Sequence, residues 1–183
     1  GQAVNPFGDG TASRRIAGKA VDLMQSDQRK RLTIVHKANV LPVTDGLFRE
    51  TVREVAEERR REDDRWTVDE LLVDTAAMKM ASQPESFDVV VTTNLFGDIL
   101  SDIAATWCGG MGLAASLNWG DMAAVAEPVH GSAPDIAGRG IANPIAAILS
   151  GALLARYRWG MAEAASRIES AVDSFLAEGQ LEG

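Results

Sequence analysis

Short runs of β-branched and other apolar residues alternate with segments of helical periodicity, and this alternation restricts the fold more than any other feature. Three runs are rich in strand formers: residues 32–35, 68–73 and 87–91. Apolar residues with helical spacing occupy the segments around them: residues 11–26, 44–61, a short stretch from Asp74, and 94–107. Strands that alternate with helices predict an α/β fold in which helices cover a sheet.

The second part of the chain has a different pattern. Residues 109–120 hold two short extended pieces among glycines, and residues 123–126 are another candidate strand. Residues 127–143 are too rich in Gly and Pro for regular structure. A helix is expected from Pro144, because Pro is favoured in the first turn, and a last helix is expected over residues 161–177.

Composition excludes several classes of protein. The formal net charge is −8, which argues against nucleic acid as a partner, because such binding depends on Lys and Arg. No apolar run reaches the roughly 20 residues that span a bilayer, so no membrane partner is expected. The one cysteine, Cys108, excludes an internal disulfide and indicates a reducing compartment: the cytoplasm, or the mitochondrial matrix in a eukaryote. Its apolar neighbours predict a buried packing role.

Two aspartates with helical spacing form the strongest chemical signal. Asp98 and Asp102 follow the 87–91 strand, and Asn94 lies one turn before them. Residues four apart on a helix share a face, and two close carboxylates repel unless a positive charge lies between them. A divalent cation that prefers oxygen ligands, Mg²⁺ or Mn²⁺, would supply it. The alternative is an acidic first turn that complements the helix dipole.

The irregular segment over residues 127–144 is a candidate ligand loop. Its small residues allow backbone N–H groups to approach a ligand closely, and His130, Asp135 and Asn143 add polar groups. A carboxylate there could accept hydrogen bonds from ribose hydroxyls and would repel a 2′-phosphate, which favours NAD over NADP. Its composition fits a plain irregular connection equally well.

Two polar residues follow predicted strands, where ligands usually bind in α/β proteins. Lys37 comes after the 32–35 strand and could act as a general base. Asp74 comes after the 68–73 strand and precedes a helix. The alternatives are a surface lysine and an aspartate that caps the helix.

Five motifs occur in an order that resembles one enzyme family. They are HKANVL, VDTAAM, FDVVVTTNLFGDILSD, GGMGLA and EPVHGSAPDIAGRGIANPIAAILS. Together they resemble the β-decarboxylating dehydrogenases that act on isopropylmalate, homoisocitrate and, with NAD, isocitrate. The resemblance covers roughly residues 13–177.

The resemblance implies roles for four of the residues already described. Asp98 and Asp102 look like the metal-binding pair of one subunit. Asp74 looks like the third metal carboxylate, contributed by the partner of a homodimer with shared active sites. Lys37 resembles the catalytic lysine that acts on the substrate hydroxyl, also in the partner's site.

It also implies a set of NAD-binding residues. Two match positions near the nicotinamide: Asn39 and Glu127. Seven match the loop that wraps the adenosine: His130, Gly131, Ser132, Ala133, Asp135, Ile136 and Asn143. Relatives that use NADP tend to carry Lys and Tyr in place of Asp135 and Ile136, so NAD is expected here.

The implied fold is the two-lobed isopropylmalate-dehydrogenase architecture without its N-terminal half. Residues 1–108 would form the smaller, dimerising lobe with the metal aspartates, and residues 109–183 part of the cofactor lobe. The expected activity is oxidative decarboxylation of a small 2-hydroxy acid: isocitrate, homoisocitrate or 3-isopropylmalate. Family residues that clamp the substrate, and the catalytic tyrosine, belong to the absent half, and Tyr157 does not match that tyrosine.

Two other functions remain open from the sequence. A non-catalytic or truncated regulatory-type partner subunit would explain the missing half, although Lys37, Asp74, Asp98 and Asp102 are all retained. A metal-dependent hydrolase would use the aspartate pair but would leave the loop at residues 130–143 without a role.

Overall fold

The computed structural model describes residues 11–26, 28–61 and 63–179. Contacts divide the chain into two compact units, Gly1–Ala104 and Ala105–Gly183. The boundary expected from the sequence, after Cys108, therefore falls inside the second unit. The expected lobes also contain residues 1–10 and 180–183, which lie outside the described part of the chain.

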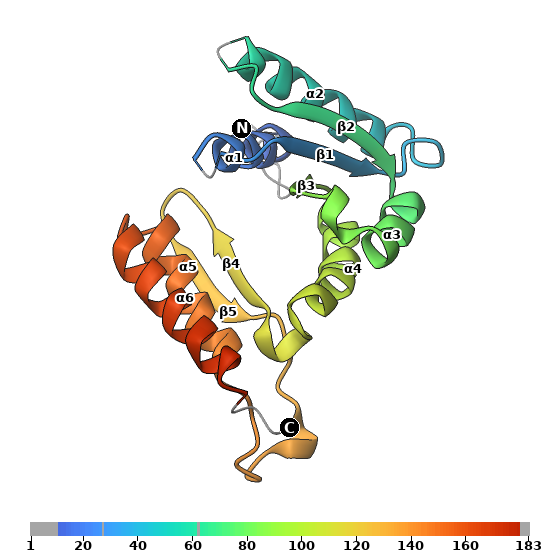
Figure 1. Cartoon of the computed structure of the whole chain (residues 1–183). Helices are drawn as coiled ribbons and strands as arrows, with labels where there is room; N and C mark the ends of the chain where they lie inside the picture. The colour runs from blue at the N-terminus through green and yellow to red at the C-terminus, as the bar shows by residue number, and fades with distance from the viewer. Residues whose placement is uncertain (1–10, 27, 62, 180–183) are drawn as a thin grey trace, which may run out of the picture. The chain divides into compact units, whose positions relative to one another are not determined.

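The first unit is built on a three-stranded parallel sheet in the order β2-β1-β3 (Figure 1). The strands are β1 (Arg31–His36), β2 (Thr67–Leu72) and β3 (Val89–Val91). In the register, Ile34 at the centre of β1 pairs with Glu70 of β2 and with Val91 of β3. Because the strands are parallel, their carboxyl ends lie along one edge of the sheet.

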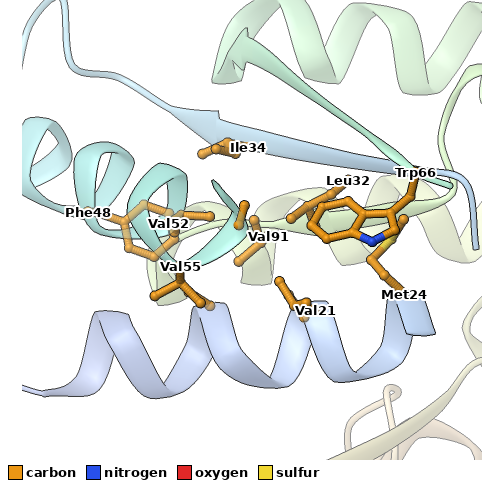
Figure 2. Close-up of a cluster of buried hydrophobic side chains, with 12 residues drawn as sticks. Val21, Met24, Leu32, Ile34, Phe48, Val52, Val55, Trp66 and Val91 are labelled. Atoms are coloured by element: carbon orange, nitrogen blue, oxygen red, sulfur yellow. The ribbon is translucent and has the colours of Figure 1, made fainter. Parts of the chain in front are cut away.

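Helices cover both faces of this sheet, as a parallel sheet requires. Leu32 and Ile34 of β1 share a core with α1 (Ala12–Ser26) and α2 (Thr44–Arg60). Figure 2 shows side chains of both helices gathered around Ile34 and Val91. On the other face, Val35 packs with α3 (Val73–Ser82) and α4 (Asn94–Ala105). The alternation of residues along β1 thus supplies two separate cores.

The second unit is a β-hairpin packed on two helices. Its elements are β4 (Ala115–Trp119), β5 (Ala124–Pro128), α5 (Ile145–Tyr157) and α6 (Ala162–Ala177). Alanines form the contact between the two helices: Ala152, Ala155 and Ala165. Ser150 of α5 is buried, and its hydroxyl lies 2.9 Å from the Glu127 carbonyl oxygen and accepts the Ser116 N–H at 3.3 Å. One side chain therefore joins α5 to both strands.

Four single turns of 3₁₀ helix complete the secondary structure of the described residues: Pro84–Ser86, Thr106–Cys108, Met111–Leu113 and Pro134–Ile136. In the same part of the chain, no helix combines the length and apolar character needed to cross a membrane.

The structure confirms the α/β prediction. The helix expected over residues 44–61 is α2, and its cap position, Val43, makes no side-chain hydrogen bond. One local prediction is wrong. Cys108 was expected to be buried, but it is exposed. The chain leaves α4 through a 3₁₀ turn that ends at Gly109 with φ +97°, which keeps Cys108 at the surface, where its thiol lies 3.2 Å from the Ala105 carbonyl oxygen.

Candidate functional site

Lys37 and Asp74 meet at the carboxyl edge of the parallel sheet. His36 and Leu72 are register partners at the ends of β1 and β2, so the residues that follow them emerge side by side. The Lys37 Nζ atom lies 2.6 Å from Asp74 Oδ1. The Lys37 hydrogen bond holds the pKa of the Asp74 carboxyl below its ordinary value. This edge therefore carries a preformed ammonium–carboxylate pair.

Lys37 is not a free surface lysine, because its side chain is 25% exposed and is ion-paired with Asp74. Asp74 is the second residue of α3, whereas the cap position is Leu72. Its carboxylate nevertheless accepts backbone N–H groups of the first turn, those of Asp74 and Thr75, so it also stabilises the start of this helix.

The helix with the paired aspartates starts from the same edge. The Thr92 hydroxyl donates to the carbonyl oxygen of Val35 at 2.8 Å, which ties the end of β3 to the end of β1. Two residues later α4 begins at Asn94. Asp98 and Asp102 are both exposed on this helix. The first turn of α4 contains no acidic residue, so the interpretation as a dipole-complementing acidic turn is wrong.

Asp98 and Asp102 offer part of a metal site. Their side chains are one helical turn apart and exposed, and their oxygen atoms are of the type that Mg²⁺ and Mn²⁺ prefer. Within the described ranges, no group of three or more His, Cys, Asp or Glu side chains comes together to hold a metal. The two carboxylates fit such a cation as two of its protein ligands. A third protein ligand would have to come from outside the described residues of this chain.

The loop at residues 130–143 lines a separate pocket inside the second unit. Its volume is about 630 Å³. Six of the nine predicted NAD-binding residues line it: His130, Gly131, Ser132, Ala133, Ile136 and Asn143. Met111 and Gly112 complete the wall together with the loop's other small residues. Most of these loop residues are exposed, so the pocket is open to solvent.

The Asn143 side chain is a polar group of this pocket that is held by a hydrogen bond. Its Oδ1 accepts the Ile145 N–H at 2.9 Å at the start of α5. With the oxygen engaged in that way, the Nδ2 amide group remains for other partners, and a β-carbon placed on Gly112 would lie 3.7 Å from it. Ala133 has a left-handed backbone, with φ +42°, a conformation that is costly for a residue with a β-carbon. Such outliers are concentrated at ligand sites.

Three of the predicted residues do not line the pocket. Asp135 is exposed in the turn next to Ile136. Glu127 lies on β5, where its carboxylate accepts a hydrogen bond from Asn118 Nδ2 at 2.9 Å. Asn39 is exposed in the turn after Lys37, in the first unit.

Comparison with known proteins decides the family. The sequence profile of the isocitrate/isopropylmalate dehydrogenase family matches residues 3–182. The chain belongs to this family. It is 56% identical over 168 residues to isocitrate/homoisocitrate dehydrogenase of Thermus thermophilus, an alignment that covers 92% of this chain and 49% of that protein. It is 47% identical over 169 residues to 3-isopropylmalate dehydrogenase of Archaeoglobus fulgidus, with coverage of 92% and 50%.

Solved structures of isocitrate/isopropylmalate dehydrogenase relatives share the fold. The crystal structure of isocitrate dehydrogenase from Methylococcus capsulatus superposes with a TM-score of 0.85 at 50% identity, and the match covers 92% of this chain and 48% of that one. This member of the family thus spans about half the length of the relatives it matches. The family and the incomplete two-lobed fold expected from the motifs are confirmed.

Sequence reasoning missed two groups of residues in this dehydrogenase-family chain. Met111 and Gly112 line the pocket, and the GGMGLA motif that contains them was the available signal. His36 and Asp45 are buried beside Lys37. His36 stands in the HKANVL motif, but nothing in the spacing of Asp45 indicated a contact with the lysine.

Proposed function

We propose that the protein of which this chain is part catalyses NAD-dependent, metal-assisted oxidative decarboxylation of a 2-hydroxy acid. The substrate class is a malate substituted at carbon 3, such as isocitrate, homoisocitrate or 3-isopropylmalate. The observation that carries this proposal is the Lys37–Asp74 contact of 2.6 Å at the carboxyl edge of the sheet. Family membership supports the reaction class, because the names of the relatives are those of such dehydrogenases.

Lys37 is the proton-transfer group in this proposal. The Lys37 ammonium beside Asp74 would first release a proton to solvent, and the neutral amine would then remove the proton of the substrate hydroxyl. The carboxylate 2.6 Å away, that of Asp74, would stabilise the ammonium that forms again. Asp98 and Asp102 would hold Mg²⁺ or Mn²⁺, with Asp74 of a second copy as the third carboxylate. The cation held by these residues would supply Lewis acidity toward substrate oxygens, and NAD would supply the hydride acceptor.

The pocket of the second unit would hold the adenosine part of NAD. Its apolar wall suits a flat base, and Asn143 Nδ2 is a hydrogen-bond donor for a ring nitrogen. Asp135 places a negative charge next to the lining residue Ile136. That charge would repel the 2′-phosphate of NADP, which supports NAD as the cofactor.

The same observations support the proposal of a homodimer with shared sites. Asp98 and Asp102 have no third acidic, His or Cys ligand among the described residues, whereas Asp74 is 63% exposed and available to a second copy. We therefore expect each site to combine α4 of one subunit with Lys37 and Asp74 of the other.

Calorimetric titration tests the metal and cofactor together. We expect Mn²⁺ to bind the dimer of this chain, and Asp98→Asn or Asp102→Asn to weaken binding by at least about tenfold, as expected for loss of a ligand. Asp173→Asn, at an exposed position of α6, is the matched control and should leave binding unchanged. NAD should bind more tightly than NADP. Equal Mn²⁺ affinity in the wild type and Asp98→Asn would refute the metal assignment.

A further inference from the structure

The peptide groups on both sides of Lys37 are held by buried side chains. Asp45 Oδ2 accepts the Lys37 N–H at 2.7 Å. His36 Nδ1 accepts the Ala38 N–H at 3.1 Å. Asp45 is 4% exposed and His36 is 5% exposed, so water cannot readily replace either acceptor. Buried hydrogen bonds of this kind are costly to leave unmade.

The carbonyl group of Lys37 is engaged as well. It accepts the N–H groups of Val40 at 2.9 Å and Leu41 at 2.8 Å. The N–H and the carbonyl group of Lys37, and the N–H of Ala38, therefore all have partners. The backbone torsions there are fixed, and with them the direction in which the side chain leaves the main chain.

Both acceptors are themselves anchored. Asp45 is an acidic residue in the first turn of α2, where the helix dipole favours negative charge. The His36 imidazole accepts through Nδ1, so its proton is on Nε2. Nε2 lies 3.7 Å from Glu70 Oε2, and Glu70 is ion-paired with Arg53. The two acceptors are thus tied to α2 and β2 and do not depend on the lysine side chain.

We propose that Asp45 and His36 are positioning residues that aim the Lys37 ammonium at its carboxylate partner. They act through the lysine backbone and would touch neither substrate nor cofactor. The consequence for catalysis rests on the proposed function of Lys37, but the positioning itself is a property of the chain alone. Without these acceptors, Lys37 should spend more time unpaired from Asp74.

The chemical reactivity of the Lys37 amine measures how much of the time it is unpaired from Asp74. The chain has four lysines: Lys19, Lys30, Lys37 and Lys79. Brief reductive methylation followed by peptide mass spectrometry yields a rate for each, and an amine held in an ion pair reacts slowly. Asp45→Ala and His36→Leu should each raise the Lys37 rate roughly fivefold relative to Lys19 and Lys79, the factor for about 1 kcal/mol of lost hydrogen bonding. Asp74→Asn removes the carboxylate partner itself and so sets the upper limit of the Lys37 methylation rate.

Conservative variants and a matched site provide the controls. Asp45→Asn and His36→Asn each keep an oxygen acceptor and should restore the Lys37 rate to within about twofold of the wild type. At the other end of β1, Asp88 Oδ2 accepts the Lys30 N–H at 2.6 Å. Asp88→Ala removes this comparable backbone hydrogen bond far from Lys37 and should leave the Lys37 rate unchanged.

The outcomes separate positioning from general destabilisation. If Asp45→Ala and His36→Leu accelerate all four lysines together, or leave Lys37 at its wild-type rate, the proposal is overturned. If Asp45→Ala does not fold, as judged by circular dichroism, the comparison of His36→Leu with His36→Asn decides. The assay uses no metal, NAD or substrate, so a failure of the proposed function would leave its result unaffected.

Discussion

Replacement of Ser150 by Ala should selectively destabilise the second unit. Ser150 is 2% exposed; its hydroxyl lies within 2.9 Å of the Glu127 and Ala146 carbonyl oxygens and accepts the Ser116 N–H at 3.3 Å. Removal of the hydroxyl leaves the N–H without this partner and deletes one donated hydrogen bond. Together these losses should cost about 1–3 kcal/mol.

The expected cost is measurable in a unit of this size. For a domain of about 60–100 residues, each 1 kcal/mol lowers Tm by about 4–8 °C. The transition of the second unit should therefore fall by roughly 4–24 °C in differential scanning calorimetry, while the transition of the first unit stays in place.

Ser174→Ala is the matched control for this experiment. Ser174 also makes a hydrogen bond to the carbonyl oxygen four residues before it, at 2.9 Å from Ser170, but it is exposed on α6. Its replacement by Ala should change stability by no more than about a few tenths of a kcal/mol, because Ala favours helix. Equal effects of the Ser150 and Ser174 variants would show that the inter-element hydrogen bonds do not stabilise the unit.

Three further outcomes follow from the structure. Lys37→Met should raise the pKa of Asp74, which is lowered mainly by the Lys37 hydrogen bond, and carboxyl ¹³C NMR titration measures the shift. The stabilisation from this ion pair is present above the pKa of Asp74 in the unfolded chain and is lost as pH falls through its pKa in the folded chain. Gly112→Leu should fill the pocket and weaken NAD binding in calorimetry, whereas Gly151→Leu, at an exposed position of α5 where a β-carbon meets nothing within 4 Å, should not. Leu32→Ala, at a position with no exposure, should lower the free energy of unfolding in urea by about 2–5 kcal/mol.

Local patterns predicted the elements because their physics is local. The β-branched run at β1 and the apolar spacing of α1 specify strand and helix through contacts that neighbouring residues already determine. The start of α5 after Pro144 follows from the fixed φ of proline. The end of α4 was less exact: the helix was expected to reach residue 107 but ends at Ala105, where a 3₁₀ turn begins at Thr106.

The site could be predicted only where sequence motifs carried it. Lys37 and Asp74 are 37 residues apart, and only the parallel pairing of β1 with β2 brings them together. From the sequence alone, a surface lysine and a helix-capping aspartate remained open interpretations of these two residues. The role of Asp45 was hidden for a different reason: its carboxylate accepts a backbone N–H eight residues away, a contact that neither helical nor strand spacing indicates. The exposure of Cys108 depended on a left-handed glycine that composition does not reveal.

The side chain of Asn143 links the pocket to the folding of α5. The oxygen of its amide group holds the first turn of the helix, and the nitrogen lies on the pocket side. Any molecule that binds the nitrogen must also slow the fraying of that first turn, because the two contacts share one rotamer. Hydrogen exchange at the opening amides of α5 would then report occupancy of the cavity, even for a ligand that produces no colour, heat or turnover.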